Sequence, residues 1–120
     1  DRTNNGPRRL ESMRFVAMAF CIRKSTYWRA GGFSEEYVGY GGEDHDFELA
    51  LSSLGIAAVL SERASVLHCE DSRSFERYRM KLVTTAAEAM PILRRRWPGK
   101  LDHSLLSALE GGFVGRLVAV

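Results

Sequence analysis

The apolar residues in the first half of the chain follow two spacings, one typical of a strand and one typical of a helix. Phe15–Ile22 is an unbroken apolar run between two arginines, and its length suits a buried strand. Over Glu43–Leu54 the apolar residues instead lie four and three positions apart, as on one face of a helix that Gly55 would end. The expected face consists of Phe47, Leu51 and Leu54.

A short helix and a loop are predicted between these two elements. Lys24–Ala30 has helical character, with Ser25 as its expected N-cap. Gly31 and Gly32 should end this helix because glycine adopts positive φ without strain. The glycine- and tyrosine-rich residues 33–42 are predicted to form a loop.

The second half predicts two short strands and then a long helix. Ile56–Leu60 and Ala64–Leu67 have the composition of strands. The helix should begin near Ser74, be kinked or restarted at Pro91, which has no N–H to donate, and end at Trp97. We expect its apolar residues to pack on the sheet: Phe75, Tyr78, Leu82, Ala86, Ala89 and Leu93.

Size and composition exclude several classes of protein. The chain has 120 residues, of which 45% are hydrophobic and 27% charged, and this argues against disorder. No apolar run approaches the ~20 residues of a membrane-spanning helix. Residues 1–7 lack the apolar core of a signal peptide and do not begin with Met, which suggests a start within a longer protein. Cys21 and Cys69 form no CxxC, which favours buried thiols, a reduced compartment and a cytoplasmic location.

The charges are divided between two segments. Residues 34–61 contain acids but no lysine or arginine, whereas bases dominate residues 72–100. This division suggests a cation or hydroxyl site in the acidic segment. The basic segment fits either a solvated helix face or contact with a phosphate-rich partner or membrane surface, and Arg94–Trp97, three cations beside an indole, fits an anionic membrane.

The strongest local signal is Gly39–Asp46, where an aromatic residue precedes two glycines and two adjacent carboxylates at a helix start. Gly41 and Gly42 would let a ligand approach the backbone. Glu43 and Asp44 would point in different directions, so that one could bind a hydroxyl while the other removes its proton. The alternative is that both acids only cap a helix, and an isolated motif of this kind favours that alternative.

His68 is the second signal, because a histidine at the end of a predicted strand can present a ring nitrogen to a metal ion. A single histidine is, however, more often a hydrogen-bonded structural residue than a metal ligand.

Several motifs taken together resemble the C-terminal, acceptor-side half of the GT-A domain of family 2 glycosyltransferases. The chain is also similar to the galactosyltransferase C-terminal domain and to bacterial chondroitin polymerase. The resemblance rests on an apolar strand, a basic pair, a G-G-F-S-E-E segment, a G-Y-G-G-E-D-x-D segment, a helix ending in glycine and a strand ending in histidine. In this chain they are Phe15–Ile22, Arg23–Lys24, 31–36, 39–46, Leu49–Gly55 and His68.

The resemblance implies an α/β fold and a role for each residue. Asp44 would be the general base that deprotonates the acceptor hydroxyl, and Glu43 would hold the acceptor. Tyr40 would stack on the sugar, with the Gly41 and Gly42 backbone lining the pocket. His68 would help to bind a divalent cation, Mn²⁺ or Mg²⁺. The implied partners are a nucleotide-sugar donor and a carbohydrate or lipid-linked acceptor, with inversion at the anomeric carbon, no nucleic acid, and peripheral contact with a membrane.

Two departures from the family pattern limit what the resemblance implies. Ala17–Ala19 stands where many members have Gly-Asn, and the first half of the family's domain, with its nucleotide pocket and DxD motif, is absent. We therefore expect residues 1–71 to be the acceptor-side part, 72–120 a helical extension, and the isolated chain to be inactive. The rival interpretation is a non-catalytic module that binds carbohydrate or a protein partner.

Overall fold

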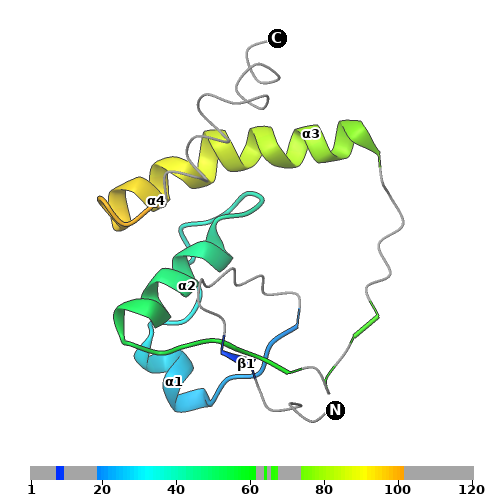
Figure 1. Cartoon of the computed structure of the whole chain (residues 1–120). Helices are drawn as coiled ribbons and strands as arrows, with labels where there is room; N and C mark the ends of the chain where they lie inside the picture. The colour runs from blue at the N-terminus through cyan, green and yellow to red at the C-terminus, as the bar shows by residue number, and fades with distance from the viewer. Residues whose placement is uncertain (1–7, 10–18, 62–63, 65, 68–73, 102–120) are drawn as a thin grey trace.

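The computed structural model of the chain describes residues 8–9, 19–61, 64, 66–67 and 74–101. In chain order these form β1, α1, α2, β2, α3, a π-helical segment η1, and α4 (Figure 1). The long helical segment α3–η1–α4 crosses above α2, and α1 lies on the other side of α2 (Figure 1). The candidate site is built where the long segment meets the start of α2.

Helix α1 spans Lys24–Arg29, close to the predicted range. Its N-cap is Arg23, without a side-chain capping bond, so the prediction of Ser25 as the cap was wrong. The glycine stop is confirmed, because Gly31 and Gly32 have φ values of 89° and 66°. Gly32 has a second constraint, since a Cβ there would lie 2.9 Å from the Tyr27 ring.

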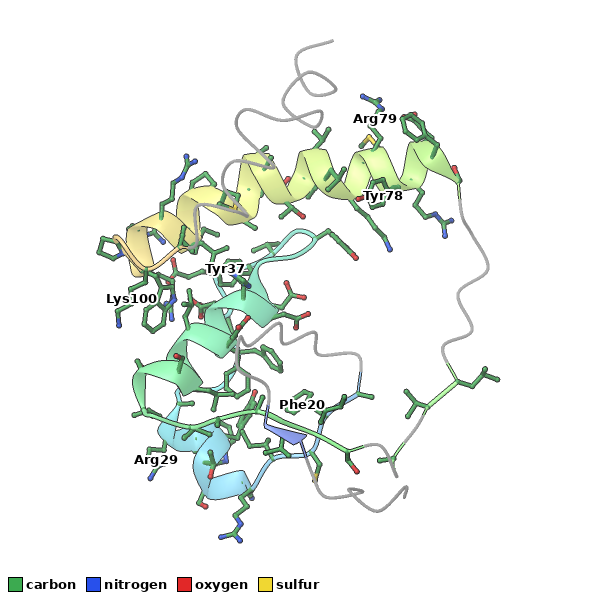
Figure 2. All side chains as sticks on the ribbon, in the orientation of Figure 1. Phe20, Arg29, Tyr37, Tyr78, Arg79 and Lys100 are labelled. Atoms are coloured by element: carbon green, nitrogen blue, oxygen red, sulfur yellow. The ribbon has the colours of Figure 1, made fainter. Side chains whose placement is uncertain are left out.

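An aromatic cluster joins α1 to α2. Phe47 of α2 is fully buried, with its ring centroid 4.9 Å from Phe33 and 5.3 Å from Tyr27. Phe20 contacts the cluster at 6.3 Å from Phe47 (Figure 2). Burying large rings makes aromatic clusters a main source of stability in a small core. This cluster fixes the side of α2 that faces α1.

Helix α2 spans Glu43–Ser53, so it begins at the predicted residue and ends one residue before the predicted end. Leu51 is buried with Phe47, which confirms the helical face for these two residues. Leu54 is the C-cap and is 42% exposed, so its place in the core was wrongly predicted. Gly55 ends the helix with a φ of 69°.

The described residues contain one small sheet, which differs from the predicted strands. β1, Arg8–Arg9, pairs antiparallel with β2, Val59–Leu60, in the register Arg8 with Leu60. Residues 19–22 of the predicted first strand and the described residues of Ala64–Leu67 are not in strands. An apolar run has the composition of a strand, but it needs a neighbouring backbone to pair with. The GT-A architecture stays a prediction.

The long C-terminal helix forms in three parts. α3 spans Phe75–Thr84, η1 spans Thr85–Ala89 and α4 spans Met90–Arg96. Ser74 is the N-cap, and its hydroxyl accepts a hydrogen bond from the Arg77 N–H. Pro91 lies in the first turn of α4, so the predicted restart is confirmed. The wide π turn precedes the proline ring, which would clash with a carbonyl of a regular α-helix.

Only the later part of this helix is buried. Ala89, Met90 and Leu93 are at most 3% exposed, whereas Phe75 and Tyr78 are 62% and 61% exposed. The prediction that Phe75 and Tyr78 pack on a sheet was therefore wrong. None of the helices in the described ranges has both the length and the apolar character of a bilayer-spanning segment.

Candidate functional site

Residues 39–46, which we call the glycine–acid segment, consist of a loop and the first turn of α2. Gly41 and Gly42 both have positive φ, 84° and 95°, and Gly42 is the N-cap of α2. Glu43 and Asp44 begin the helix, as predicted. Because glycine has no side chain to cap the helix, the first N–H groups of α2 receive no side-chain capping bond from it. The two acids thus lie at the positive end of the helix dipole.

Both glycines also allow the loop to lie against η1. A Cβ on Gly41 would be 2.7 Å from the Thr85 hydroxyl oxygen, and one on Gly42 would be 2.6 Å from the Ala89 Cβ. The Thr85 hydroxyl lies within hydrogen-bonding distance of the Tyr40 carbonyl, at 3.1 Å, and of the Lys81 carbonyl. The glycines are therefore needed for loop–helix packing, whatever their role towards an acceptor.

Replacing Gly42 with alanine should destabilise the fold more than replacing Gly55. Both glycines have left-handed φ, which costs an alanine about 1–2 kcal/mol. A Cβ at Gly55 meets nothing within 4 Å, whereas at Gly42 it collides with Ala89, adding about 1–3 kcal/mol of overpacking. Urea unfolding of Gly42→Ala and Gly55→Ala measures the difference. Equal destabilisation of the two variants would show that the loop does not lie against η1.

Tyr40 lies on the outer side of this loop. The residue is 52% exposed, and the Lys81 ammonium lies 4.8 Å from the ring centroid. A cation over an aromatic face is a favourable contact that holds the ring in place. The exposed ring remains available for the stacking role that the resemblance implies, and that role stays a prediction.

Glu43 and Asp44 occupy a partly exposed position between the loop and the solvent. In the described part of the chain, the Glu43 Oε2 atom is buried and has no hydrogen-bond partner. A buried carboxylate oxygen without a donor is unfavourable, so such an atom calls for an explanation such as a ligand or a water molecule. The role expected for Glu43 towards an acceptor stays a prediction.

The sequence interpretation missed Asp46, the third acid of the motif. Asp46 is 1% exposed, and its Oδ1 atom accepts three hydrogen bonds. The donors are Arg96 Nε at 2.7 Å, Trp97 Nε1 at 2.7 Å and the Tyr37 hydroxyl at 3.2 Å. We call these four residues the Asp46 clasp. It joins the start of α2 to the end of α4.

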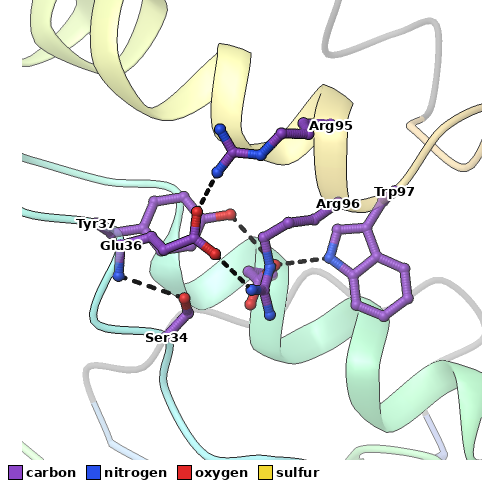
Figure 3. Close-up of polar contacts among 7 residues, drawn as sticks. Ser34, Glu36, Tyr37, Arg95, Arg96 and Trp97 are labelled. Carbon is purple, nitrogen blue, oxygen red and sulfur yellow. Dashed lines mark hydrogen bonds and ion pairs between the residues drawn. The ribbon is translucent and has the colours of Figure 1, made fainter.

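A second acid extends this contact at the surface. Glu36 accepts a hydrogen bond from Arg96 Nη1 at 2.9 Å, and it also pairs with Arg95 (Figure 3). Arg96 therefore bridges two carboxylates, one buried and one exposed. The predicted membrane cluster Arg94–Trp97 is thus partly engaged within the protein.

The buried Asp46 carboxylate changes the pKa values of two of its hydrogen-bond donors, Tyr37 and Arg96. Burial, together with the nearby Asp46 charge and the hydrogen bond to it, raises the pKa of Tyr37 above its ordinary value. The hydrogen bond to Asp46 is the main cause that raises the pKa of Arg96. Tyr37 therefore stays a neutral donor and Arg96 a cation at neutral pH.

One signal could have revealed the clasp in the sequence. Asp46 directly precedes the core residue Phe47 and lies one helical turn before Ala50, so it is at the edge of the apolar face. An acid placed there needs a cation, because an unpaired buried charge is costly. The three arginines before Trp97 were the available cations, but their distance along the chain hid the pairing.

The proposed metal site falls outside the described residues, because His68 does. Within the described ranges, no three His, Cys, Asp or Glu side chains are placed to hold a metal ion together. The divalent cation site stays a prediction, and no chemical step is assigned to a metal. Cys69 also lies outside the described residues, and Cys21 is exposed rather than buried.

Comparison with known proteins gives one family. The family described as the N-terminal domain of galactosyltransferase matches residues 4–82, which is more than half of the chain. The matched range includes the whole glycine–acid loop, α2 and most of α3. The sequence resemblance was to a C-terminal galactosyltransferase domain, and the glycosyltransferase relationship is the part that both share. A search of curated proteins and a search of solved structures found no significant match.

Proposed function

Because the chain belongs to the family described as the N-terminal domain of galactosyltransferase, we propose that it transfers a sugar from a nucleotide-sugar donor to an acceptor hydroxyl. The observation that carries this proposal is the position of the two adjacent acids. Glu43 and Asp44 begin α2 after a glycine loop, and both are partly exposed. The nearby Asp46 is buried and is held by the clasp.

The two acids divide the reaction between them. Asp44 accepts the proton of the acceptor hydroxyl, and the resulting oxygen attacks the anomeric carbon of the donor sugar. The bond from that carbon to the diphosphate oxygen breaks, so the nucleoside diphosphate leaves and the configuration inverts. A positioned general base contributes about 10²–10⁴-fold to the rate. Glu43 accepts a hydrogen bond from the acceptor through its partly exposed carboxylate, and the exposed Tyr40 ring packs against the sugar.

A transfer assay tests this proposal directly. The protein, in its full natural length, is incubated with UDP-galactose, UDP-glucose or UDP-N-acetylglucosamine and a panel of mono- and disaccharides. We expect release of UDP together with an acceptor product one sugar heavier. Saccharide binding without UDP release or product, across the panel, would contradict sugar transfer and support a non-catalytic module.

Replacing Glu43 with glutamine should weaken acceptor binding more than it changes turnover. The substitution keeps the size of the side chain but removes the charge from the hydrogen bond, and hydrogen bonds to charged groups contribute about 1.5–3 kcal/mol. The acceptor KM should therefore rise on the order of tenfold or more. Glu35→Gln, in an exposed loop position, is the matched control and should leave KM unchanged. An unchanged KM in Glu43→Gln would remove Glu43 from the acceptor site.

A further inference from the structure

We propose that Arg96 and Trp97 are positioning residues of this site, acting through Asp46 on the acid pair at the start of α2. The proposal rests on the proposed function for its catalytic meaning, but its structural part stands on the contacts alone. It makes the end of α4 a working part of the site rather than an extension of the domain.

Asp46 is rigidly connected to the acid pair, Glu43 and Asp44. Glu43, Asp44 and Asp46 share the first turn of α2, and the Asp46 N–H donates to the Gly42 carbonyl at 2.9 Å. Residues within one hydrogen-bonded helical turn move together, because each is fixed by the same backbone ladder. Whatever holds the Asp46 carboxylate therefore also sets the position of Glu43 and Asp44.

The Asp46 carboxylate is held from two directions. Tyr37 approaches from the loop that precedes α2, while Arg96 and Trp97 approach from the end of α4 (Figure 3). Bonds to a charged acceptor are short and strong, and the 2.7 Å distances from Arg96 and Trp97 agree with this. The rigid indole of Trp97 donates from one fixed direction, so it fixes the orientation of the carboxylate as well as its location.

The loop before the acid pair is attached to the same helical segment. The glycine loop lies on η1, where the Thr85 hydroxyl approaches the Tyr40 carbonyl and Ala89 lies beneath Gly42. The same helical segment therefore holds residues both before and after Glu43 and Asp44. A motion of this segment would move the acid pair relative to a bound acceptor, and a misplacement of about 1 Å can cost about 10²-fold in rate.

The test compares Arg96→Gln and Trp97→Phe with a matched control. Arg79→Gln breaks an exposed arginine–carboxylate pair with Glu76, within α3 on the same helical segment. Hydrogen–deuterium exchange is measured on the backbone amides of residues 37–46, with residues 24–29 of α1 as the internal reference. In the UDP-release assay, kcat and the acceptor KM are measured for each variant.

We expect faster exchange in residues 37–46, and not in α1, for Arg96→Gln and Trp97→Phe, with no change for Arg79→Gln. The kcat value should fall at least tenfold, while the acceptor KM changes less than threefold, and Arg96→Lys should restore part of the kcat.

Exchange in residues 37–46 that stays at the wild-type rate in both clasp variants would overturn the proposal, whatever the activity. Faster exchange with unchanged kcat would also overturn it. Failure of the proposed function is recognised separately, because Asp44→Asn would then leave UDP release unchanged while the exchange result stands on its own.

Discussion

Replacing Asp44 with asparagine is expected to reduce sugar transfer by about 10²–10⁴-fold, the contribution of a positioned general base. Asparagine keeps the shape of the side chain and can still serve the start of a helix, but it cannot accept the acceptor proton. Asp44 is partly exposed at the first turn of α2, where the charge of an acid contributes about 0.3–1 kcal/mol, so the substitution should lower the free energy of unfolding by no more than about 1 kcal/mol. Product formation and thermal unfolding are measured on the same preparation.

The matched control for this variant is Glu76→Gln, which removes an exposed carboxylate from the first turn of α3. The control should keep full activity and stability. Transfer by Asp44→Asn at the wild-type rate would show that Asp44 only supports the helix start, which was the alternative left open by the isolated motif.

Replacing Asp46 with alanine, unlike replacing Asp44 with asparagine, is expected to lower the free energy of unfolding strongly. The change removes the acceptor of three hydrogen bonds and leaves the Tyr37 hydroxyl and the Trp97 N–H without their partner. Arg96 keeps its bond to Glu36 and reaches solvent, so the full penalty of a stranded buried charge does not apply. We expect a loss of about 3 kcal/mol, in the range of breaking bonds to a buried charged group.

Urea unfolding measures this loss, and Glu76→Ala is the control. The Glu76–Arg79 pair is an exposed ion pair three residues apart, and solvent screening leaves such a pair with little effect on stability. A loss in Asp46→Ala no larger than that of the control would show that the clasp does not form in solution. A double-mutant cycle with Arg96→Gln then isolates the pairwise part of the energy.

The helices were predictable because their signals are local. Glycine after α1 and α2, serine before α3 and proline at the start of α4 each act on the backbone next to them. The spacing of Phe47 and Leu51 also identified the buried face of α2. Even so, Ser25 was not the cap of α1, because a suitable residue type does not determine which position begins the helix.

The long-range contacts could not be predicted in the same way. An apolar face predicts that a helix packs against another element, but it does not predict how much of the face that element covers. Thus Leu93 is buried, whereas Phe75 and Tyr78 on the same helical spacing are exposed. The position of Glu43 and Asp44 was readable from their glycines, whereas the pairing of Asp46 with Arg96 depends on how two distant helices meet.

The π turn has a consequence for how the length of this protein can vary. Thr85 contacts the loop before α2, and Arg96 contacts Asp46. The helix between them therefore sets both the distance and the rotation that separate these two contacts. Each residue of an α-helix turns its successors by about 100°, and a π turn accommodates one extra residue. Deleting one residue at positions 86–88 would therefore restore a regular α-helical turn and keep Arg96 and Trp97 facing Asp46. Deleting one residue within α4 would instead rotate Arg96 and Trp97 away from Asp46, because no π turn there takes up the change of length.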